Sequence, residues 1–353
     1  MGDMPLVCHQ ATVTPPALEF MHLAGLSPPK NLLPYSTGSE AIALARQRIE
    51  LGERLVFIYP PLPGVGTADE LLVPVTAYGV FNDKRRIPEF VDEKYLPKRQ
   101  IISRQKFTEL KDLLPEQPVF VKAGVEGASG AGQDVRYCPD ESAWQEAIQF
   151  YHERKDDLSG LVIEEAISVS TCWCLGVTIL DDGCHYLGGA IQLFDKPAKQ
   201  TGNRIDPDFP VPDEAIQIAI VIAEEAMRRG YRGVAGFDIG IDANNKLFVF
   251  DLNFRLNSCT SQLMIYDHVT QRTGARVSQS WQIEKTGSIS NLLERLAPFA
   301  EAGVFIPFRM FDQETYNACC PGIEAQSVVT GVIVAESVVE IESLDATMKQ
   351  ALV

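Results

Sequence analysis

Residues 234–255 read VAGFDIGIDANNKLFVFDLNFR, and their pattern predicts two β-strands joined by a tight turn. The turn falls at residues 242–245, where Asp and Asn tolerate left-handed backbone and hydrogen-bond to nearby peptide groups. The expected register sets Asp238 opposite Val249. Asp238 and Asp251 then become diagonal neighbours on adjacent strands, about 7–8 Å apart at the backbone. We therefore expect these two carboxylates to share a bound ion.

One face of the predicted hairpin carries polar side chains, because side chains alternate along each strand. The polar residues on this face are Asp238, Asp251, Asn253 and Arg255. Two carboxylates and one amide oxygen suit one or two Mg²⁺ ions, with Mn²⁺ as an alternative. Gly236 and Gly240 lie on the same face and are expected to leave room for the ion. The competing interpretation is an ordinary solvent-exposed sheet face with common turn residues.

The composition limits the class of protein. A chain of 353 residues with 46% hydrophobic and 22% charged residues is typical of a globular protein with two or three structural units. A net charge of −16 argues against a nucleic-acid partner. No apolar run approaches the ~18 residues that a membrane span needs. Residues 1–25 lack a secretory pattern, so we expect a cytoplasmic location. The eight cysteines lack zinc-site spacing and are expected to be free thiols.

A glycine-rich segment follows a lysine that ends a predicted strand. The strand covers residues 118–122, ends at Lys122, and is followed by AGVEGASGAG at residues 123–132. Residues 134–138 are predicted to form the next strand. Glycine lets backbone N–H groups approach phosphate oxygens, and the lysine adds a positive charge. This pattern predicts a flap over a triphosphate, whereas a mobile hairpin without a ligand is the alternative.

The other elements follow from periodicity and from capping residues. Helices are predicted at residues 41–51, 103–114, 140–151, 213–229 and 289–299, and a loop that feeds a helix at 256–266. Further strands are predicted at residues 54–59, 160–165, 171–180 and 185–190, with two short ones across 327–341. The charged residues 82–100 are interpreted as a connection between units. Residues 194–212 are interpreted as a polar loop that holds phosphate or a substrate carboxylate, or else is only solvated.

The ordered set of motifs resembles the ATP-grasp superfamily of carboxylate–amine ligases. The set comprises Lys122 with the glycine-rich flap, a strand that ends in Glu164 and Glu165, and the hairpin with Asp238 followed by DLNFR at 251–255. Together these motifs cover about residues 100–270. The segment KAGVEGAS is similar to the flap of D-alanine–D-alanine ligases, and DLNFR is similar to the family's Glu-x-Asn-x-Arg segment. The small terminal regions are similar to those of pheganomycin-type peptide ligases.

The resemblance implies roles for individual residues. Residues that would contact ATP are Lys106, Lys122, Glu126, Gly127, Ser129, Gly130, Glu164, and the backbone of Glu165, Ala166 and Ile167. Asp238, Asp251 and Asn253 would hold Mg²⁺. Arg255 would stabilise an acyl phosphate and the tetrahedral intermediate, and Lys122 would assist it by binding the α- and β-phosphates. The implied reaction is ATP-dependent amide-bond formation between a carboxylate and an amine, such as amino acids or peptides, with release of ADP and phosphate.

The resemblance also implies the overall organisation, which is an α/β fold with α+β parts. Residues 1–95 would form a small α/β unit, residues 96–285 the ATP-grasp region, and residues 286–353 a small α+β appendage. We expect no membrane partner and a homodimer. The chain departs from the family pattern at two places. Ser170 and Thr171 lie where the family usually has an acid that binds the ribose. Ala128 replaces a flap serine, which disfavours D-alanine ligation. A kinase, a carboxylase and a non-catalytic nucleotide-binding protein remain alternatives.

Overall fold

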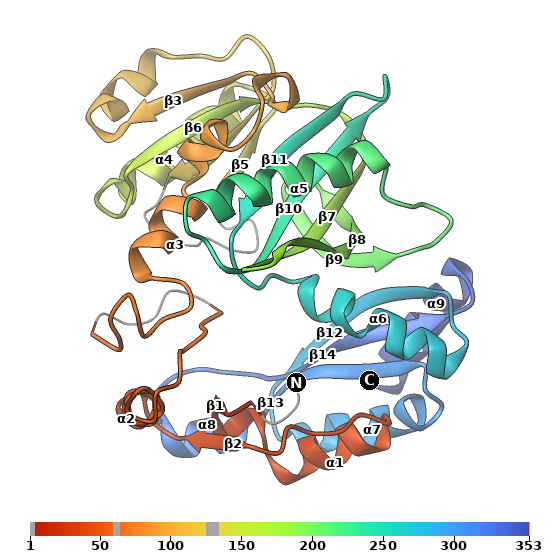
Figure 1. Ribbon diagram of the computed structural model, residues 1–353. Helices are drawn as coiled ribbons and strands as arrows, with labels where there is room; N and C mark the ends of the chain where they lie inside the picture. The colour runs from red at the N-terminus through yellow and green to blue at the C-terminus, as the bar shows by residue number, and fades with distance from the viewer. Residues whose placement is uncertain (1–3, 59–63, 125–133, 353) are drawn as a thin grey trace.

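The computed structural model describes residues 4–58, 64–124 and 134–352. Within these residues the chain builds three sheets, two of which are large enough to carry helices on a face (Figure 1). The α/β class with α+β parts is confirmed. No helix in the described part of the chain is both long enough and apolar enough to cross a bilayer.

The largest sheet has eight strands in the order β11-β10-β7-β8-β9-β12-β14-β13. Its strands are β7 (Val169–Leu180), β8 (Gly183–Lys196), β9 (Lys199–Ile205), β10 (Gly233–Asp242), β11 (Leu247–Asn253), β12 (Val277–Lys285), β13 (Phe305–Phe311) and β14 (Ser327–Ala335). All neighbouring strands are antiparallel. The predicted boundary at residue 285 follows β12, which pairs with β14. The sheet is therefore continuous from the predicted ATP-grasp region into the C-terminal region.

The helix α5 (Asp213–Arg228) covers one face of this sheet (Figure 1). Its alanines and isoleucines recur at helical spacing and pack against alternate residues of β7 and β10. Phe237 is fully buried in this core, next to Asp238 in the chain. Burying a side chain of that size stabilises the fold by about 1.5–3 kcal/mol. The alternation of the strand therefore turns Asp238 to the opposite face, away from α5.

The smaller sheet has the order β3-β6-β4-β5. Its strands are β3 (Arg99–Ser103), β4 (Val119–Gly124), β5 (Val135–Cys138) and β6 (Gly160–Glu165). Helix α4 (Glu141–Glu153) packs on one face through a core that includes Trp144 and Tyr151. Because Val121 and Ile163 belong to that core, their neighbours Lys122 and Glu164 lie on the other face. This second face therefore carries the charged pair of Lys122 and Glu164.

The N-terminal elements pack against the C-terminal end of the chain. A two-stranded parallel sheet, β1 (Leu6–His9) and β2 (Leu32–Tyr35), lies beside α2 (Gly38–Glu50). Helix α1 (Pro15–Leu23) shares a core with α7 (Ile289–Glu301) and α9 (Val338–Ala351). The remaining helices are α3 (Val75–Asn82), α6 (Thr260–Thr273) and α8 (Gln313–Cys319). Short 3-10 helices are η1 (Gln10–Thr12), η2 (Lys84–Glu89), η3 (Glu93–Tyr95), η4 (Arg104–Asp112) and η5 (Lys155–Asp157).

Several predicted elements are wrong. Within residues 54–58 there is only an isolated bridge from Leu55 to Leu71 instead of a strand. The supposed loop at 194–212 contains β9, which pairs with the extended β8. The two short strands predicted across residues 327–341 are instead one strand, β14, and the start of α9, where the Ser337 hydroxyl accepts a hydrogen bond from the Glu340 amide. Such a cap outweighs the β-propensity of the valines that follow.

Candidate active site

The two acids of the β10–β11 hairpin face each other directly. Asp238 pairs with Asp251 in the ladder, so the predicted diagonal register is wrong. The turn is one residue longer than expected, because the Asp242 amide donates to the Lys246 carbonyl at 3.0 Å. A β-bulge then inserts Phe250 as an extra residue beside Asp238. Bulges change the direction of a strand locally, and this one brings the carboxylates closer together than predicted.

A lysine from η2 binds one of these acids. Lys84 Nζ lies 2.6 Å from both Oδ1 and Oδ2 of Asp251, and the lysine is buried. The sequence analysis missed this residue because residues 82–100 were interpreted as a charged connection. No local pattern marks this lysine, because its partner lies 167 residues away in the chain. Asp83 itself is buried and holds the neighbouring Arg85 through its carboxylate.

A second charged cluster lies on the small sheet. Lys122 pairs with Glu164, and its Nζ also donates to the Phe250 carbonyl at 2.8 Å. Glu164 is 2% exposed, and its Oε1 lies 2.5 Å from Nη2 of Arg99. The bulge at Phe250 therefore provides a carbonyl that connects the large sheet to the lysine of the small sheet. The structure therefore places Lys122 beside both Glu164 and the β10–β11 hairpin.

The two hairpin acids have opposite pKa shifts. Burial, and then the negative charge of Asp251, raises the pKa of Asp238 to about 6. Hydrogen bonds with Gln192 and Cys174 oppose this increase. Burial would also raise the pKa of Asp251, but the charges of Lys84 and Lys122 outweigh it and hold that pKa below its usual value. One carboxylate is therefore firmly ionised, and the other binds a proton close to neutrality.

Arg255 lies at the end of the same polar row. Its Nη2 donates to the Asn253 Oδ1 at 2.8 Å, and its Nη1 donates to the Leu256 carbonyl. The peptide between them is fixed because the Phe254 amide donates to the Asn82 side chain at 3.0 Å. The Phe254 ring is fully buried among aromatic rings of the large core. This packing holds the segment that carries the amide oxygen and the guanidinium.

The room expected beside Asp238 is already filled. A side chain at Gly236 would collide with Asn257, whose amide nitrogen would lie 1.7 Å from the added Cβ. A side chain at Gly240 would meet the Phe250 ring at 2.8 Å. These glycines are therefore needed so that protein side chains can approach the strand closely. They do not provide space for an ion, and that part of the prediction is wrong.

The segment after β6 offers fewer backbone donors than expected. The amide of Glu165 donates to the Lys98 carbonyl at 2.9 Å, and the amide of Ala166 donates to the Pro118 carbonyl at 3.0 Å. These two N–H groups are committed within the protein. An adenine edge would have to be recognised by the carbonyl groups of this segment, by the Ile167 amide, and by the Glu164 carboxylate.

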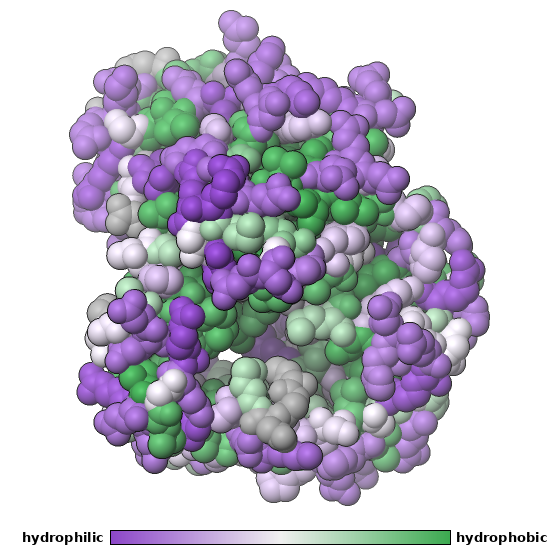
Figure 2. All heavy atoms as spheres, in the orientation of Figure 1, coloured by the Kyte–Doolittle hydropathy of each residue, from purple (hydrophilic) through white to green (hydrophobic). Residues whose placement is uncertain are grey.

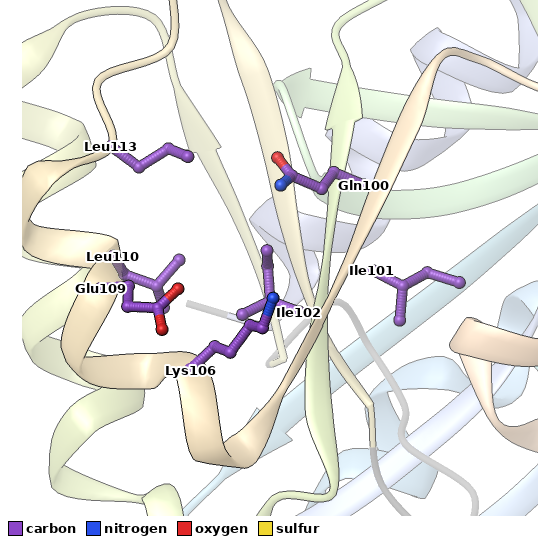
Figure 3. Close-up of a pocket in the computed structure, with 7 residues that line it drawn as sticks. All are labelled: Gln100, Ile101, Ile102, Lys106, Glu109, Leu110 and Leu113. Carbon is purple, nitrogen blue, oxygen red and sulfur yellow. The ribbon is translucent and has the colours of Figure 1, made fainter.

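Lys106 does not join the charged cluster. It lies on η4 in a separate pocket of about 100 Å³, together with Glu109, and faces Gln100 and Ile102 of β3 (Figure 3). Ile102 belongs to the core under α4, on the face of the small sheet opposite Lys122. The short segment between the two lysines does not carry Lys106 round to the polar face. Lys84, which contacts Asp251, is instead the second lysine of this cluster.

Some of the predicted site residues cannot be compared with the structure. Glu126, Gly127, Ser129 and Gly130 of the flap lie outside the described residues. The strands on either side, β4 and β5, are paired as expected for a hairpin that carries a flap. On the face shown in Figure 2, hydrophilic residues lie mainly around the edge, and hydrophobic residues lie across the middle, where the surface is hollowed.

The donor set fits a hard divalent cation. Asp238 and Asp251 are adjacent, and the Asn253 amide belongs to the same row. Burial and then repulsion by Asp251 raise the pKa of Asp238, and a divalent cation would favour the ionised form of this acid. Lys84 occupies part of this position by binding Asp251. Positively charged side chains from η2, from the small sheet and from the end of β11 lie around these acids. This arrangement suits a ligand that carries phosphate groups.

Two protein-family models match the chain. A model described as L-aspartate–L-methionine ligase, ATP grasp, matches residues 97–253, and a model of the N-terminal domain of the same ligase matches residues 1–78. The chain belongs to the ATP-grasp carboxylate–amine ligases. This assignment confirms the resemblance noted from the motifs, and with it an ATP-dependent ligase that forms C–N bonds. The narrower likeness to pheganomycin-type ligases stays a prediction.

Solved structures share the fold of this ligase at low sequence identity. The L-amino acid ligase from Bacillus licheniformis is 13% identical, with a TM-score of 0.59, and the match covers 99% of this chain and 98% of that one. N5-carboxyaminoimidazole synthetase from Staphylococcus aureus, complexed with ADP, is 13% identical with a TM-score of 0.59 over 97% and 89% of the two chains. Biotin carboxylase from Campylobacter jejuni is 13% identical with a TM-score of 0.58, and the match covers 96% of this chain and 89% of that one.

Proposed function

We propose that this ligase joins two free amino acids into a dipeptide through an acyl-phosphate intermediate. L-Aspartate and L-methionine are the first pair to test, because both matching family models carry those names. The observation that best supports the reaction type is the direct opposition of Asp238 and Asp251, with Lys84 and Lys122 beside them. Phosphoryl transfer depends on positioning and charge neutralisation, and this arrangement supplies both.

The proposed reaction has two steps. In the first, a carboxylate oxygen of one amino acid attacks the γ-phosphorus of ATP, and ADP leaves. In the second, the amine of the other amino acid attacks the acyl carbon, phosphate leaves, and the amine loses a proton. Arg255 would stabilise the negative charge that develops on the acyl oxygen. Its guanidinium is already oriented by Asn253 and Leu256.

The small sheet would hold the nucleotide. Lys122 would bind the α- and β-phosphates, and Glu164 would accept from the adenine amino group. Flap residues Glu126, Gly127, Ser129 and Gly130 would cover the phosphates and exclude water, which would otherwise hydrolyse the acyl phosphate. Backbone groups from Glu165 to Ile167 would meet the adenine edge, without the two amides that bind Lys98 and Pro118.

Asp238, Asp251 and Asn253 would hold Mg²⁺. Such an ion, when bound, would neutralise negative charge on the phosphate groups of ATP. The chain's own residues prepare for it, since Lys84 keeps Asp251 ionised before the ion arrives. The proposal includes one or two ions, with Mn²⁺ as an alternative to Mg²⁺, a cytoplasmic location and a homodimer.

The test is a product analysis with ATP, Mg²⁺ and pairs of amino acids. ADP and phosphate that appear only with both amino acids, together with a dipeptide identified by mass spectrometry, would support the proposal. Transfer of ¹⁸O from a labelled carboxylate to phosphate would support the acyl phosphate. AMP and pyrophosphate would instead indicate adenylation and would overturn the proposed intermediate. ADP formation without a dipeptide would count against ligation of the pair tested.

A further inference from the structure

Arg99 lies inside the nucleotide half of the site, and no motif drew attention to it. It is the first residue of β3, where it pairs with Glu164 of β6. Its side chain is 8% exposed, and its Nη2 lies 2.5 Å from Glu164 Oε1 in an ion pair. Its Nε and Nη1 atoms are buried and have no hydrogen-bond partner among the described residues. A buried guanidinium with unused donors requires a physical explanation.

The charges around Arg99 balance among the described residues only while no metal ion is bound. The cations are Lys84, Lys122 and Arg99, and the anions are Asp238, Asp251 and Glu164. With every acid ionised these charges cancel, so a bound divalent cation would leave two positive charges in excess. Uncompensated buried charge is costly, and arginine does not lose its proton in proteins. The cluster is therefore arranged to receive an anion.

Glu164 alone cannot satisfy both of its cationic partners. Lys122 and Arg99 contact different oxygens of that one carboxylate. Lys122 has a second acceptor in the Phe250 carbonyl, whereas the remaining donors of Arg99 are unused among the described residues. A guanidinium presents its N–H groups in a plane that matches two oxygens of a phosphate group.

We propose that Arg99 is a nucleotide-binding residue that donates from Nε and Nη1 to phosphate oxygens of ATP while Nη2 holds Glu164. This role rests on the ATP-dependent ligase activity and adds a second cation from the small sheet, beside Lys122, to its phosphate site. The anion is a phosphate group and not the substrate carboxylate, because Arg99 shares its sheet face and its acidic partner with Lys122. The base-recognising carboxylate and the phosphate group are then connected through one side chain.

The experiment measures binding and does not require turnover. Wild type and Arg99→Gln are titrated with ADP, with inorganic tripolyphosphate and with adenosine, each in the presence of Mg²⁺. Because hydrogen bonds to a charged group are lost, the affinity for tripolyphosphate and for ADP is expected to fall about 10- to 100-fold. The affinity for adenosine should stay nearly unchanged. Arg99→Lys should recover part of the loss. Arg104→Gln is the matched control, because that arginine is exposed and pairs with Asp156.

The phosphate role is overturned if Arg99→Gln binds tripolyphosphate as wild type does. It is also overturned if the affinity for adenosine falls as much as the affinity for ADP. Such a result would mean that the substitution disturbs binding of the base or the fold, and not binding of the phosphates. Thermal unfolding of each variant separates a folding defect from a binding defect. A wrong choice of amino acids in the proposed function would leave all three affinities intact. Wild-type protein that bound neither ADP nor tripolyphosphate would overturn this proposal as well.

Discussion

The two sheets contribute opposite charges to one site. The large sheet supplies Asp238 and Asp251 through backbone pairing on adjacent strands, whereas the small sheet supplies Lys122 and Arg99 around Glu164. Side chains connect these halves, from Lys84 to Asp251 and from Lys122 to the Phe250 carbonyl. The geometry of the acidic half is fixed by a β-ladder, while that of the basic half depends on long side chains. The two halves should therefore respond differently to substitution.

The largest effect is expected in the acidic half. Asp251→Asn removes the carboxylate that pairs with Lys84 and keeps its shape, so the fold should persist. Turnover should fall by about 10²–10³ or more, because a preorganised charged group is lost. The measurement is ADP release under saturating ATP and Mg²⁺. Asp182→Asn, in the exposed β7–β8 turn, serves as the control, and normal activity in Asp251→Asn would remove this residue from the site.

Lys84→Met tests the connection between the halves. The lysine is buried, and its removal leaves Asp251 without its closest cation. We expect a loss of about 3 kcal/mol in the free energy of unfolding, the lower end for breaking a buried pair, because Lys122 and Arg255 still act on the acid. Denaturant unfolding gives the value. Lys94→Met is the control, because that lysine is exposed. If both variants lost equally little free energy of unfolding, the Lys84 pair would contribute little to stability.

Lys122→Ala tests the basic half. Its charge should matter for binding ATP, because it lies between Glu164 and the carbonyl of the bulge. The KM for ATP should rise about tenfold or more, while the KM values for the amino acids change less. Initial rates measured against each substrate give the comparison. An unchanged ATP dependence would mean that the flap and its lysine lie away from the phosphates.

A smaller effect follows from the pKa of Asp238, which is raised to about 6. The unfolded chain loses this proton near pH 4, so the folded state binds more protons between about pH 4 and pH 6. This contribution to stability is therefore present at low pH and is lost as the pH rises through that window. Asp238→Asn removes the effect. In chelator, the melting temperature of the variant relative to wild type should increase from pH 4 to pH 7.

Wild type serves as the control for this pH experiment. All other titrating groups are the same in the two proteins, so their effects on the melting temperature cancel in the difference between variant and wild type. A difference in melting temperature that stayed constant across the range would show that Asp238 ionises normally. The same reasoning predicts that Mg²⁺ competes with a proton at Asp238 below about pH 6. Asp251 would not show this competition, since its pKa is lowered.

The sequence predicted the chemistry of each half better than their geometry. Alternation along β10 and β11 placed Asp238 and Asp251 on one face correctly. The register was not accessible, because neither the longer turn nor the bulge at Phe250 changes the hydrophobic pattern. Lys84 was not found because its partner is 167 residues away in the chain, and no local pattern encodes such a contact. Lys106 was chosen because it precedes the flap in the sequence.

The smallest expected effect concerns that choice. Lys106→Ala should leave the KM for ATP and the turnover rate within about twofold of wild type, because exposed substitutions away from a site change little. Its side chain lines the pocket beside Glu109 and Gln100, and the core under α4 separates that pocket from Lys122. Measured beside Lys122→Ala, this variant tests which face of the small sheet binds the nucleotide. A large rise in the KM for ATP on removing Lys106 would reverse the assignment of the two faces. An unchanged KM would support binding of the nucleotide at the face with Lys122, Glu164 and Arg99, where further substitutions should then be made.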